Sequence, residues 1–238
     1  MEIKVYKKDF EYSYSLGAFP TMELIKNRPN DVIKVLIHSS FENEKVLKEI
    51  KSLVNPSIIF ISDKTVEKLS EKGNCFVIGV FKKYVTTLDL NKDHLLLDNP
   101  SNMGNLGTII RSSLGFGINN IAIIKPGVDI YDPKVVRSSM GSIFSCNIEY
   151  FNSIDDYKNK YNNHTIYAFM LKAKKSLRDS SFDKAPLTLA FGNEATGLND
   201  SYLDENSLII KHSNKIDSLN ITNAVSIALY EYSEKMKM

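Results

Sequence analysis

The chain alternates short apolar runs with segments of helical pattern, and this alternation constrains its fold more than any other feature. Parallel strands need long crossover connections, usually helices, so strands that alternate with helices predict an α/β fold with a parallel sheet. Helices should cover both faces of that sheet. The predicted strands are 35–38, 57–61, 75–80, 94–98, 120–124, 165–170, 187–191 and 207–211, and the predicted helices are 42–51, 62–69, 106–114 and 219–235.

A polar stretch at 84–93 interrupts the alternation and has the composition of a linker. We therefore predict two α/β domains, 1–88 and 94–238, and the chain is long enough for each to bury a core. No apolar run approaches the roughly 20 residues of a membrane helix. The first nine residues lack the apolar core of a signal peptide, so we expect a cytoplasmic protein without a membrane segment.

Composition and charge leave the function open. The formal net charge is only +2, which does not by itself indicate nucleic-acid binding. Cys75 and Cys146 lie far apart in the sequence without nearby ligand-type residues, so we expect two buried thiols rather than a disulfide or a zinc site. The histidines show no metal-ligand spacing either, and no metal is expected.

A loop of small and polar residues at 98–105 connects a predicted strand to a predicted helix, which is a suitable place for anions and polar ligands. Asn105 stands at the expected start of the helix, and Arg111 follows six residues later. In an ideal helix Arg111 would lie about 240° past Asn105. Both reach one cleft if Asn105 sits at the helix cap, and an Asn-capped helix with a surface arginine is the alternative.

Two later segments place polar residues where a strand ends or a helix begins. Gly192 ends a predicted buried strand and would let a ligand approach the backbone closely, and Glu194 follows at the mouth of that strand. A glycine-rich turn with a solvated glutamate is the alternative. Ser218 and Asn220 precede the last predicted helix, where either residue could be an N-cap.

Taken together, in this order and spacing, residues 105–111, 192–198 and 218–221 resemble the three motifs of the SpoU (TrmH-like) family of RNA ribose 2′-O-methyltransferases, part of the SPOUT class. The resemblance is close over 94–238. It implies a trefoil-knotted methyltransferase domain, one of the rare exceptions to unknotted chains. It also implies S-adenosylmethionine as the cofactor and a homodimer whose active sites draw on both subunits. Residues 1–88 resemble the family's RNA substrate-binding domain in outline.

The resemblance implies roles for particular residues. The implied catalytic and substrate-positioning residues are Asn105, Arg111, Glu194, Ser218 and Asn220, and the implied cofactor-binding residues are Gly192, Ile210 and Leu219. Arg137 lies in a family-like stretch at 131–141 and is a candidate RNA contact. Lys82 and Lys83, at the end of a predicted strand, are candidate contacts to the RNA backbone, with ordinary surface charges as the alternative for all three.

The first motif indicates a class of RNA. Ser112-Ser113-Leu114 and the run Gly104–Gly107 resemble the family branch that methylates large-subunit ribosomal RNA and confers thiostrepton resistance. Ribosomal RNA is therefore favoured, with transfer RNA as the alternative within the family. A non-catalytic RNA-binding member of the fold is a further alternative, against which the full set of polar motif residues argues.

Elementary chemistry limits the roles that these residues can take. Arginine has a pKa above about 12, so we expect Arg111 to bind a phosphate and stabilise a developing alkoxide rather than act as a base. Glu194 is expected to orient Arg111 or groups near it. Asn105, Ser218 and Asn220 would supply neutral hydrogen bonds.

Overall fold

The computed structural model describes residues 3–70, 73–183, 185–204 and 206–236. The chain forms two compact units, one of Met1–Tyr84 and Asp129–Ser145, the other of Val85–Val128 and Cys146–Met238. This division differs from the predicted domains 1–88 and 94–238, because the 129–145 segment groups with the N-terminal residues. The chain crosses from one unit to the other after Tyr84, Val128 and Ser145. The polar stretch predicted as a linker, 84–93, contains only the first of these crossings.

The N-terminal unit is an α/β unit with a four-stranded sheet in the order β1-β4-β2-β3. β4 is antiparallel to both β1 and β2, whereas β2 and β3 are parallel. The prediction of a parallel sheet is therefore wrong for this unit, since alternation of elements does not fix the direction of a strand inserted between two others. Its elements are β1 (Tyr12–Leu16), α1 (Ala18–Asn27), β2 (Val32–Ile37), α2 (Glu44–Leu53), β3 (Ile59–Ile61), α3 (Asp63–Leu69), β4 (Val77–Lys82) and α5 (Pro133–Ser138).

Successive residues of β2 point to opposite faces of this sheet, as strand geometry requires. Leu36 belongs to a buried cluster that includes Val66 and Leu69 of α3. Val35 and Ile37 belong to a second cluster, with residues of α1 and α2. Each face of the sheet therefore has its own apolar core.

The 129–145 segment is fixed to the N-terminal unit by contacts distant in sequence. Ser13 Oγ donates a hydrogen bond of 2.5 Å to the carbonyl of Tyr131, and Arg28 Nε donates one of 3.2 Å to the carbonyl of Phe144. Gly141 has φ +83°, and a Cβ there would lie 2.7 Å from Cβ of Glu23. Such contacts leave no signal in local sequence periodicity, which explains why the predicted boundary missed them.

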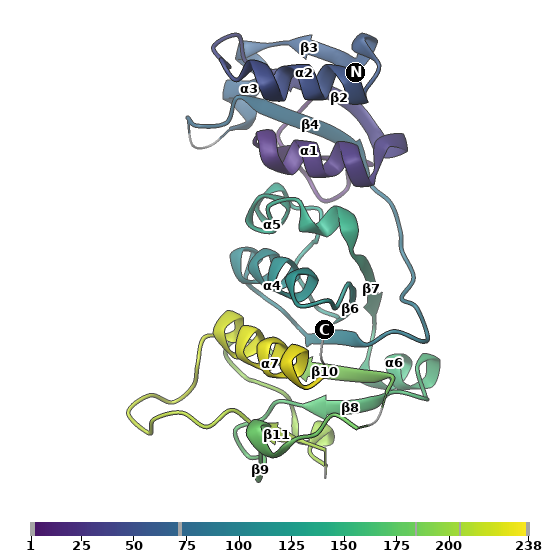
Figure 1. Cartoon of the computed structure of the whole chain (residues 1–238), viewed down its shortest axis with the longest axis vertical. Helices are drawn as coiled ribbons and strands as arrows, with labels where there is room; N and C mark the ends of the chain where they lie inside the picture. Colours follow the sequence, from purple (N-terminus) through teal and green to yellow (C-terminus); the bar gives the residue numbers. More distant parts are fainter. Residues whose placement is uncertain (1–2, 71–72, 184, 205, 237–238) are drawn as a thin grey trace. The chain divides into compact units, whose positions relative to one another are not determined.

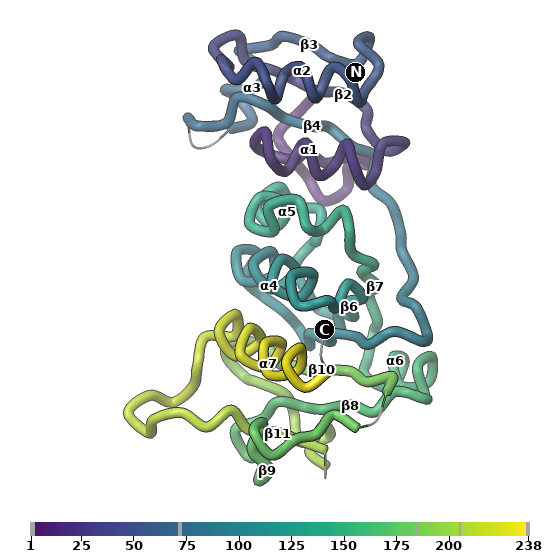
Figure 2. The backbone as a smooth tube through the Cα atoms, in the orientation of Figure 1, coloured from purple at the N-terminus to yellow at the C-terminus, as the bar shows by residue number. Residues whose placement is uncertain are grey.

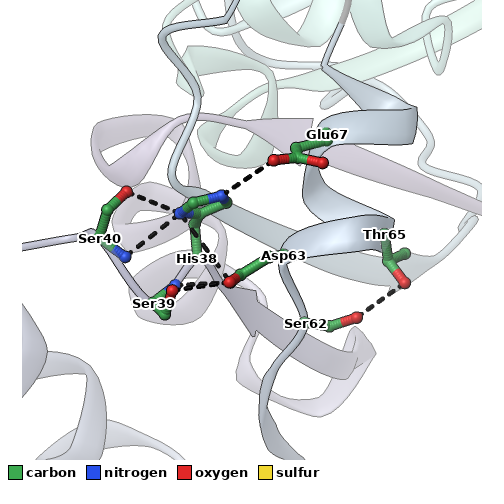
Figure 3. Close-up of polar contacts among 7 residues, drawn as sticks. All are labelled: His38, Ser39, Ser40, Ser62, Asp63, Thr65 and Glu67. Carbon is green, nitrogen blue, oxygen red and sulfur yellow. Dashed lines mark hydrogen bonds and ion pairs between the residues drawn. The ribbon is translucent and has the colours of Figure 1, made fainter.

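Polar contacts join the end of β2 to the start of α3 (Figure 3). The backbone N–H and the hydroxyl of Ser39 donate hydrogen bonds of 2.7 and 2.6 Å to the Asp63 carboxylate. These bonds lower the pKa of Asp63 below its ordinary value. His38 Nδ1 lies 2.7 Å from the Ser40 hydroxyl. These contacts fix the turn after β2.

The C-terminal unit has a five-stranded sheet in the order β7-β6-β5-β10-β8, and all of its strand pairs are parallel, as predicted for this part of the chain (Figure 1). A separate parallel pair joins β9 to β11. The elements are β5 (His94–Asp98), α4 (Met103–Gly115), β6 (Asn120–Ile124), β7 (Asn147–Phe151), α6 (Ile154–Lys160), β8 (Thr165–Ala168), β9 (Lys175–Ser176), β10 (Leu187–Phe191), β11 (Leu208–Ile209) and α7 (Ile221–Met236).

The core of this unit explains why its apolar strands were easy to identify. β5, β6 and β10 match the predicted ranges 94–98, 120–124 and 187–191 at both ends, and β6 and β10 are buried throughout. Tyr157 of α6 and Tyr161, which caps that helix, pack into a buried cluster with small residues of the sheet, while α4 packs against α7. The predicted strand 207–211 contains only the two-residue strand β11.

Two further expectations concern cysteines and membranes. Cys75 and Cys146 are free and buried, as predicted. Among the helices that the structure describes, none has the length and apolar composition needed to cross a bilayer. Within the same described residues, no group of three or more His, Cys, Asp and Glu side chains is arranged to hold a metal ion.

Candidate functional site

The candidate site lies where the order of strands in the parallel sheet reverses. β6 and β7 extend the sheet on one side of β5, and β10 and β8 extend it on the other. In open parallel sheets, ligands bind at the carboxyl ends of the strands next to such a point. The loops that follow β5 and β10 meet there, since Asn193 Nδ2 donates a hydrogen bond of 2.7 Å to the carbonyl of Asn99.

Glu194 ties these two loops together through four hydrogen bonds. Its Oε2 accepts bonds from the backbone N–H of Ser101 at 3.1 Å and from the Ser101 hydroxyl at 2.7 Å. Its Oε1 accepts bonds from the backbone N–H of Asn102 and from Nδ2 of Asn105, both at 3.2 Å. Burial would raise the pKa of Glu194, but the bonds from Ser101 and Asn105 outweigh it and the pKa is lowered. The carboxylate is therefore ionised and fixed in orientation.

Asn105 lies in the first turn of α4 rather than at its cap. The N-cap is Asn102, whose side-chain oxygen accepts a bond of 3.0 Å from the Asn105 backbone N–H. The helix begins two residues before the expected start near Asn105, because Met103 and Gly104 adopt helical geometry as well. The Asn105 amide points to Glu194 instead, so the first two motifs are in direct contact.

Arg111 is exposed on α4, two turns beyond the Glu194 contacts. Within the described residues Arg111 forms no ion pair, and Glu194 accepts its bonds from Ser101, Asn102 and Asn105. Glu194 therefore does not orient Arg111. It orients neighbouring groups instead, which was the alternative expectation. The Arg111 guanidinium is left available for an external anion.

A pocket of about 290 Å³ opens beside the loop that follows β10. Five of the eight residues predicted for catalysis or cofactor binding line it, and these are Gly192, Glu194, Ile210, Ser218 and Leu219. They come from three separate segments of the chain. Asn105, Arg111 and Asn220 are not among its lining residues, although Asn105 contacts the pocket residue Glu194.

Gly192 is required by the fold of its own loop. A Cβ at this position would lie 2.1 Å from the carbonyl carbon of Gly197 and 2.2 Å from the backbone nitrogen of Leu198. Real Cβ atoms do not approach backbone this closely. The group that comes closest to Gly192 is the returning chain at Gly197, whose N–H donates to the carbonyl of Asn193 at 2.9 Å. Gly192 also lines the pocket, and its contact with a ligand stays a prediction.

The third motif combines a cap with a pocket wall. Asn220 immediately precedes α7, and its Oδ1 accepts bonds of 2.8 and 2.6 Å from the backbone N–H and hydroxyl of Thr222. This is the N-cap role that the sequence left open for Ser218 or Asn220. Ser218 is exposed and, with Leu219, lines the pocket.

The pocket also uses residues that the sequence analysis did not identify. The rings of Phe169 and Phe191 stack with centroids 4.4 Å apart and planes 6° apart, and both rings line the pocket. Ser101, which holds Glu194, was missed as well. The sequence could have indicated Phe169, since it directly follows β8 and so lies at the same edge of the sheet as Gly192. Ser101 has no distinguishing feature in the sequence and resembles any loop serine.

The candidate RNA contacts Arg137, Lys82 and Lys83 all lie in the N-terminal unit. Arg137 donates a hydrogen bond of 3.0 Å to the side chain of Asn74. Lys83 donates one of 2.8 Å to the carbonyl of Lys8 and lies over the ring of Tyr6. Lys82 is exposed. Two of the three cations are thus engaged within the unit, and Lys82 is the most open to solvent.

Comparison with protein families identifies the class to which this arrangement belongs. The model of the SpoU rRNA Methylase family matches residues 92–230, more than half of the chain. The chain therefore belongs to the SpoU rRNA methylase family, as the three motifs predicted.

Among individual proteins, the chain is 28% identical over 205 residues to a 23S rRNA (uridine(2479)-2′-O)-methyltransferase of Streptomyces viridochromogenes, covering 80% of this chain and 71% of that enzyme. It is 27% identical over 145 residues to a putative tRNA (cytidine(34)-2′-O)-methyltransferase of Listeria monocytogenes, covering 58% and 85%. It spans only 28% of the human mitochondrial rRNA methyltransferase 3, to which it is 33% identical over 137 residues.

The fold has close counterparts among solved structures. The crystal structure of the SpoU methyltransferase AviRb from Streptomyces viridochromogenes, in complex with the cofactor AdoMet, superimposes with a TM-score of 0.82 at 24% identity. The match covers 95% of this chain and 91% of that one. It confirms the predicted α/β fold, in which the five-stranded sheet of the C-terminal unit is parallel.

Proposed function

We propose that this chain transfers a methyl group from S-adenosylmethionine to a ribose 2′-hydroxyl of RNA. The observation that carries the proposal is that all three sequence motifs meet at one site. Glu194 of the second motif holds Asn105 of the first, and the second and third motifs line a single pocket. Membership of the SpoU rRNA methylase family supports the same activity.

The pocket fits S-adenosylmethionine. The stacked rings of Phe169 and Phe191 give an aromatic wall suited to a purine, and the 192–198 and 209–219 segments bring backbone groups that can hydrogen-bond an adenosine. Gly192, Ile210 and Leu219 would bind the cofactor. The volume of the pocket, about 290 Å³, is close to the range of small-molecule sites, which begins at about 300 Å³. When bound, S-adenosylmethionine supplies an electrophilic methyl group and a neutral leaving group.

The remaining motif residues would position the ribose. Arg111 binds the phosphate beside the target nucleotide and stabilises negative charge as it develops on the 2′-oxygen. Asn105, held by Glu194, donates or accepts a hydrogen bond at the ribose, and Ser218 and Asn220 supply further neutral contacts. Alignment of the reacting atoms can contribute several kcal/mol to the rate, so this chemistry needs no metal.

Ribosomal RNA is the favoured substrate class. The Streptomyces 23S rRNA methyltransferase is matched over 80% of this chain, including residues outside the family model, whereas the Listeria tRNA-type relative is matched over 58%. Transfer RNA is the second candidate, because that Listeria relative is covered over 85% of its own length.

The proposal extends to the architecture that the family implies. The C-terminal unit, whose backbone Figure 2 draws as a tube, would hold a trefoil knot. Two copies would pair, and α7 offers a surface for pairing because Ile227 and Tyr230 are 42% and 54% exposed. The N-terminal unit would select the RNA, with Arg137, Lys82 and Lys83 as contacts. A cytoplasmic location accords with this role.

One experiment tests the proposal directly. The purified protein is incubated with methyl-labelled S-adenosylmethionine and with ribosomal or transfer RNA from cells that lack the gene. The expected product is label in ribosomal RNA at linkages that resist alkali, because a 2′-O-methyl group blocks strand cleavage there. Cofactor binding without label in either RNA would refute the proposed activity, and label in transfer RNA alone would refute the substrate preference.

A further inference from the structure

Six basic side chains are concentrated in two short segments of the C-terminal unit, 171–178 and 206–216. They are Lys172, Lys174, Lys175, Arg178, Lys211 and Lys215. Neither segment contains Asp or Glu, so all 28 acidic residues of the chain lie elsewhere, together with 24 of its 30 basic residues. Without these segments the chain would carry net negative charge, although as a whole it is slightly positive.

The fold brings the two segments side by side. β9 pairs in parallel with β11, with Lys175 opposite Leu208 and Ser176 opposite Ile209. Strands paired in this way lie about 4.8 Å apart. Arg178 and Lys211 each follow the paired residues by two positions. We call the two segments together the basic strip.

The side chains of the basic strip are accessible to a ligand. All six are exposed. Lys172 forms an ion pair of 2.7 Å with Asp200. For the other five, the described part of the chain provides no ion pair and no side-chain hydrogen bond. Asp179 and Asp217 directly follow the two segments but form no ion pair with these five side chains in the described residues. Exposed cations that form no ion pair repel one another, so an anionic partner would lower the energy of this arrangement.

The basic strip is held in place and adjoins the pocket. Nζ of Lys235, on α7, donates hydrogen bonds to the carbonyls of Leu177, Arg178 and Ser180 at 3.1, 3.1 and 2.6 Å. Two residues of the basic strip, Lys172 and His212, line the pocket itself. The strip is therefore preorganised next to the point where the reacting ribose would enter.

We propose that the basic strip binds backbone phosphates of the RNA strand that flanks the methylated nucleotide. This inference rests on the proposed function and adds a phosphate-binding surface in the C-terminal unit to the contacts expected of the N-terminal unit. Phosphate contacts fix the register of a nucleic acid without reading its sequence. The strip thus helps to position the ribose, while the choice of RNA is made elsewhere.

The test uses the full-length variant Lys174→Ala/Lys175→Ala. Each phosphate contact on a single strand contributes about 0.7 to the slope of log K against log salt, so losing two lowers the slope by about 1.4. A fluorescein-labelled single-stranded RNA, titrated over a series of KCl concentrations, measures this slope. Affinity at low salt should fall by up to about fivefold for each lysine. The KM for the RNA that accepts the methyl group should rise similarly, with kcat unchanged.

The matched control is Lys92→Ala/Lys158→Ala, which removes two exposed lysines of the same unit outside the basic strip. A salt slope that changes equally in the two double variants would overturn the proposal. So would a parallel loss of affinity for S-adenosylmethionine alone, because the strip would then serve the pocket rather than RNA. If the wild-type protein methylates no RNA, the proposed function fails, whereas methylation with unaltered slopes refutes only the role of the basic strip.

Discussion

Replacing Glu194 with glutamine isolates the contribution of the carboxylate that joins the first two motifs. The carboxylate accepts four hydrogen bonds, two at each oxygen. A glutamine side chain keeps one oxygen and places an N–H₂ group where the second oxygen was. That group faces donors, so two bonds are lost and the loop or Asn105 must move.

The size of the effect follows from these two bonds. Glu194 is half-buried, so each bond is assigned the value typical of a neutral pair, about 1 kcal/mol, rather than the larger value of a buried charge. The loss of about 2 kcal/mol in the transition state corresponds to a rate lower by about 30-fold. Affinity for S-adenosylmethionine should change little, because the aromatic and backbone walls of the pocket remain.

The assay is single-turnover methyl transfer to RNA under saturating cofactor, with cofactor affinity measured separately by calorimetry. Ser101→Ala is the graded control, since it removes only the 2.7 Å hydroxyl bond and should slow transfer by about fivefold. Ser101→Thr keeps a hydroxyl and should recover most of the rate. A Glu194→Gln rate within about twofold of wild type would refute the reasoning, because two lost bonds cannot have so small an effect.

Three further outcomes are expected. Gly192→Ala should abolish binding of S-adenosylmethionine in calorimetry, because the added Cβ overlaps the backbone at Gly197; full affinity would contradict the loop geometry. Arg111→Ala should abolish transfer while nearly preserving cofactor affinity, and equal loss of both would show that its role is misassigned. Buried His94 has its pKa lowered to about 4, first by burial. The unfolded chain therefore takes up a proton near pH 6.5 that the folded chain does not, and stability should fall by about 2 kcal/mol between pH 7 and about pH 5. Urea unfolding measures this loss, which should be much smaller in His94→Gln; an equal loss in that variant would assign it to other groups.

The apolar strands of the C-terminal unit could be predicted from the sequence because burial on both sides leaves an unbroken apolar run. β10 is an example, with all five residues buried. β7 was missed, since three of its five residues are only half-buried and two of them, Asn147 and Glu149, are polar. α1 was missed because Pro20 and Thr21 weaken its helical pattern.

The sequence predicted which residues belong to the candidate site, but not which of them contact one another. The motifs identified Glu194 and Asn105, which indeed meet. Of the two alternatives for Glu194, Arg111 was the obvious counter-charge, but the structure shows neighbouring groups instead, and these donors include a loop serine without distinctive spacing. Likewise, Gly192 was identified correctly as special, but only the structure shows that the close neighbour is Gly197 of the same chain.

The discontinuous N-terminal unit has a consequence for biosynthesis. Asp129–Ser145 belongs to that unit, although 44 residues of the other unit, Val85–Val128, are made in between. During translation the unit therefore lacks α5, and the bonds from Ser13 and Arg28 have no acceptors, until the ribosome has released residue 145. Domains usually fold as units from the N-terminus as they emerge. The N-terminal unit is therefore completed only after β5 and β6 of the other unit have emerged, and a fragment ending at Tyr84 should be marginal.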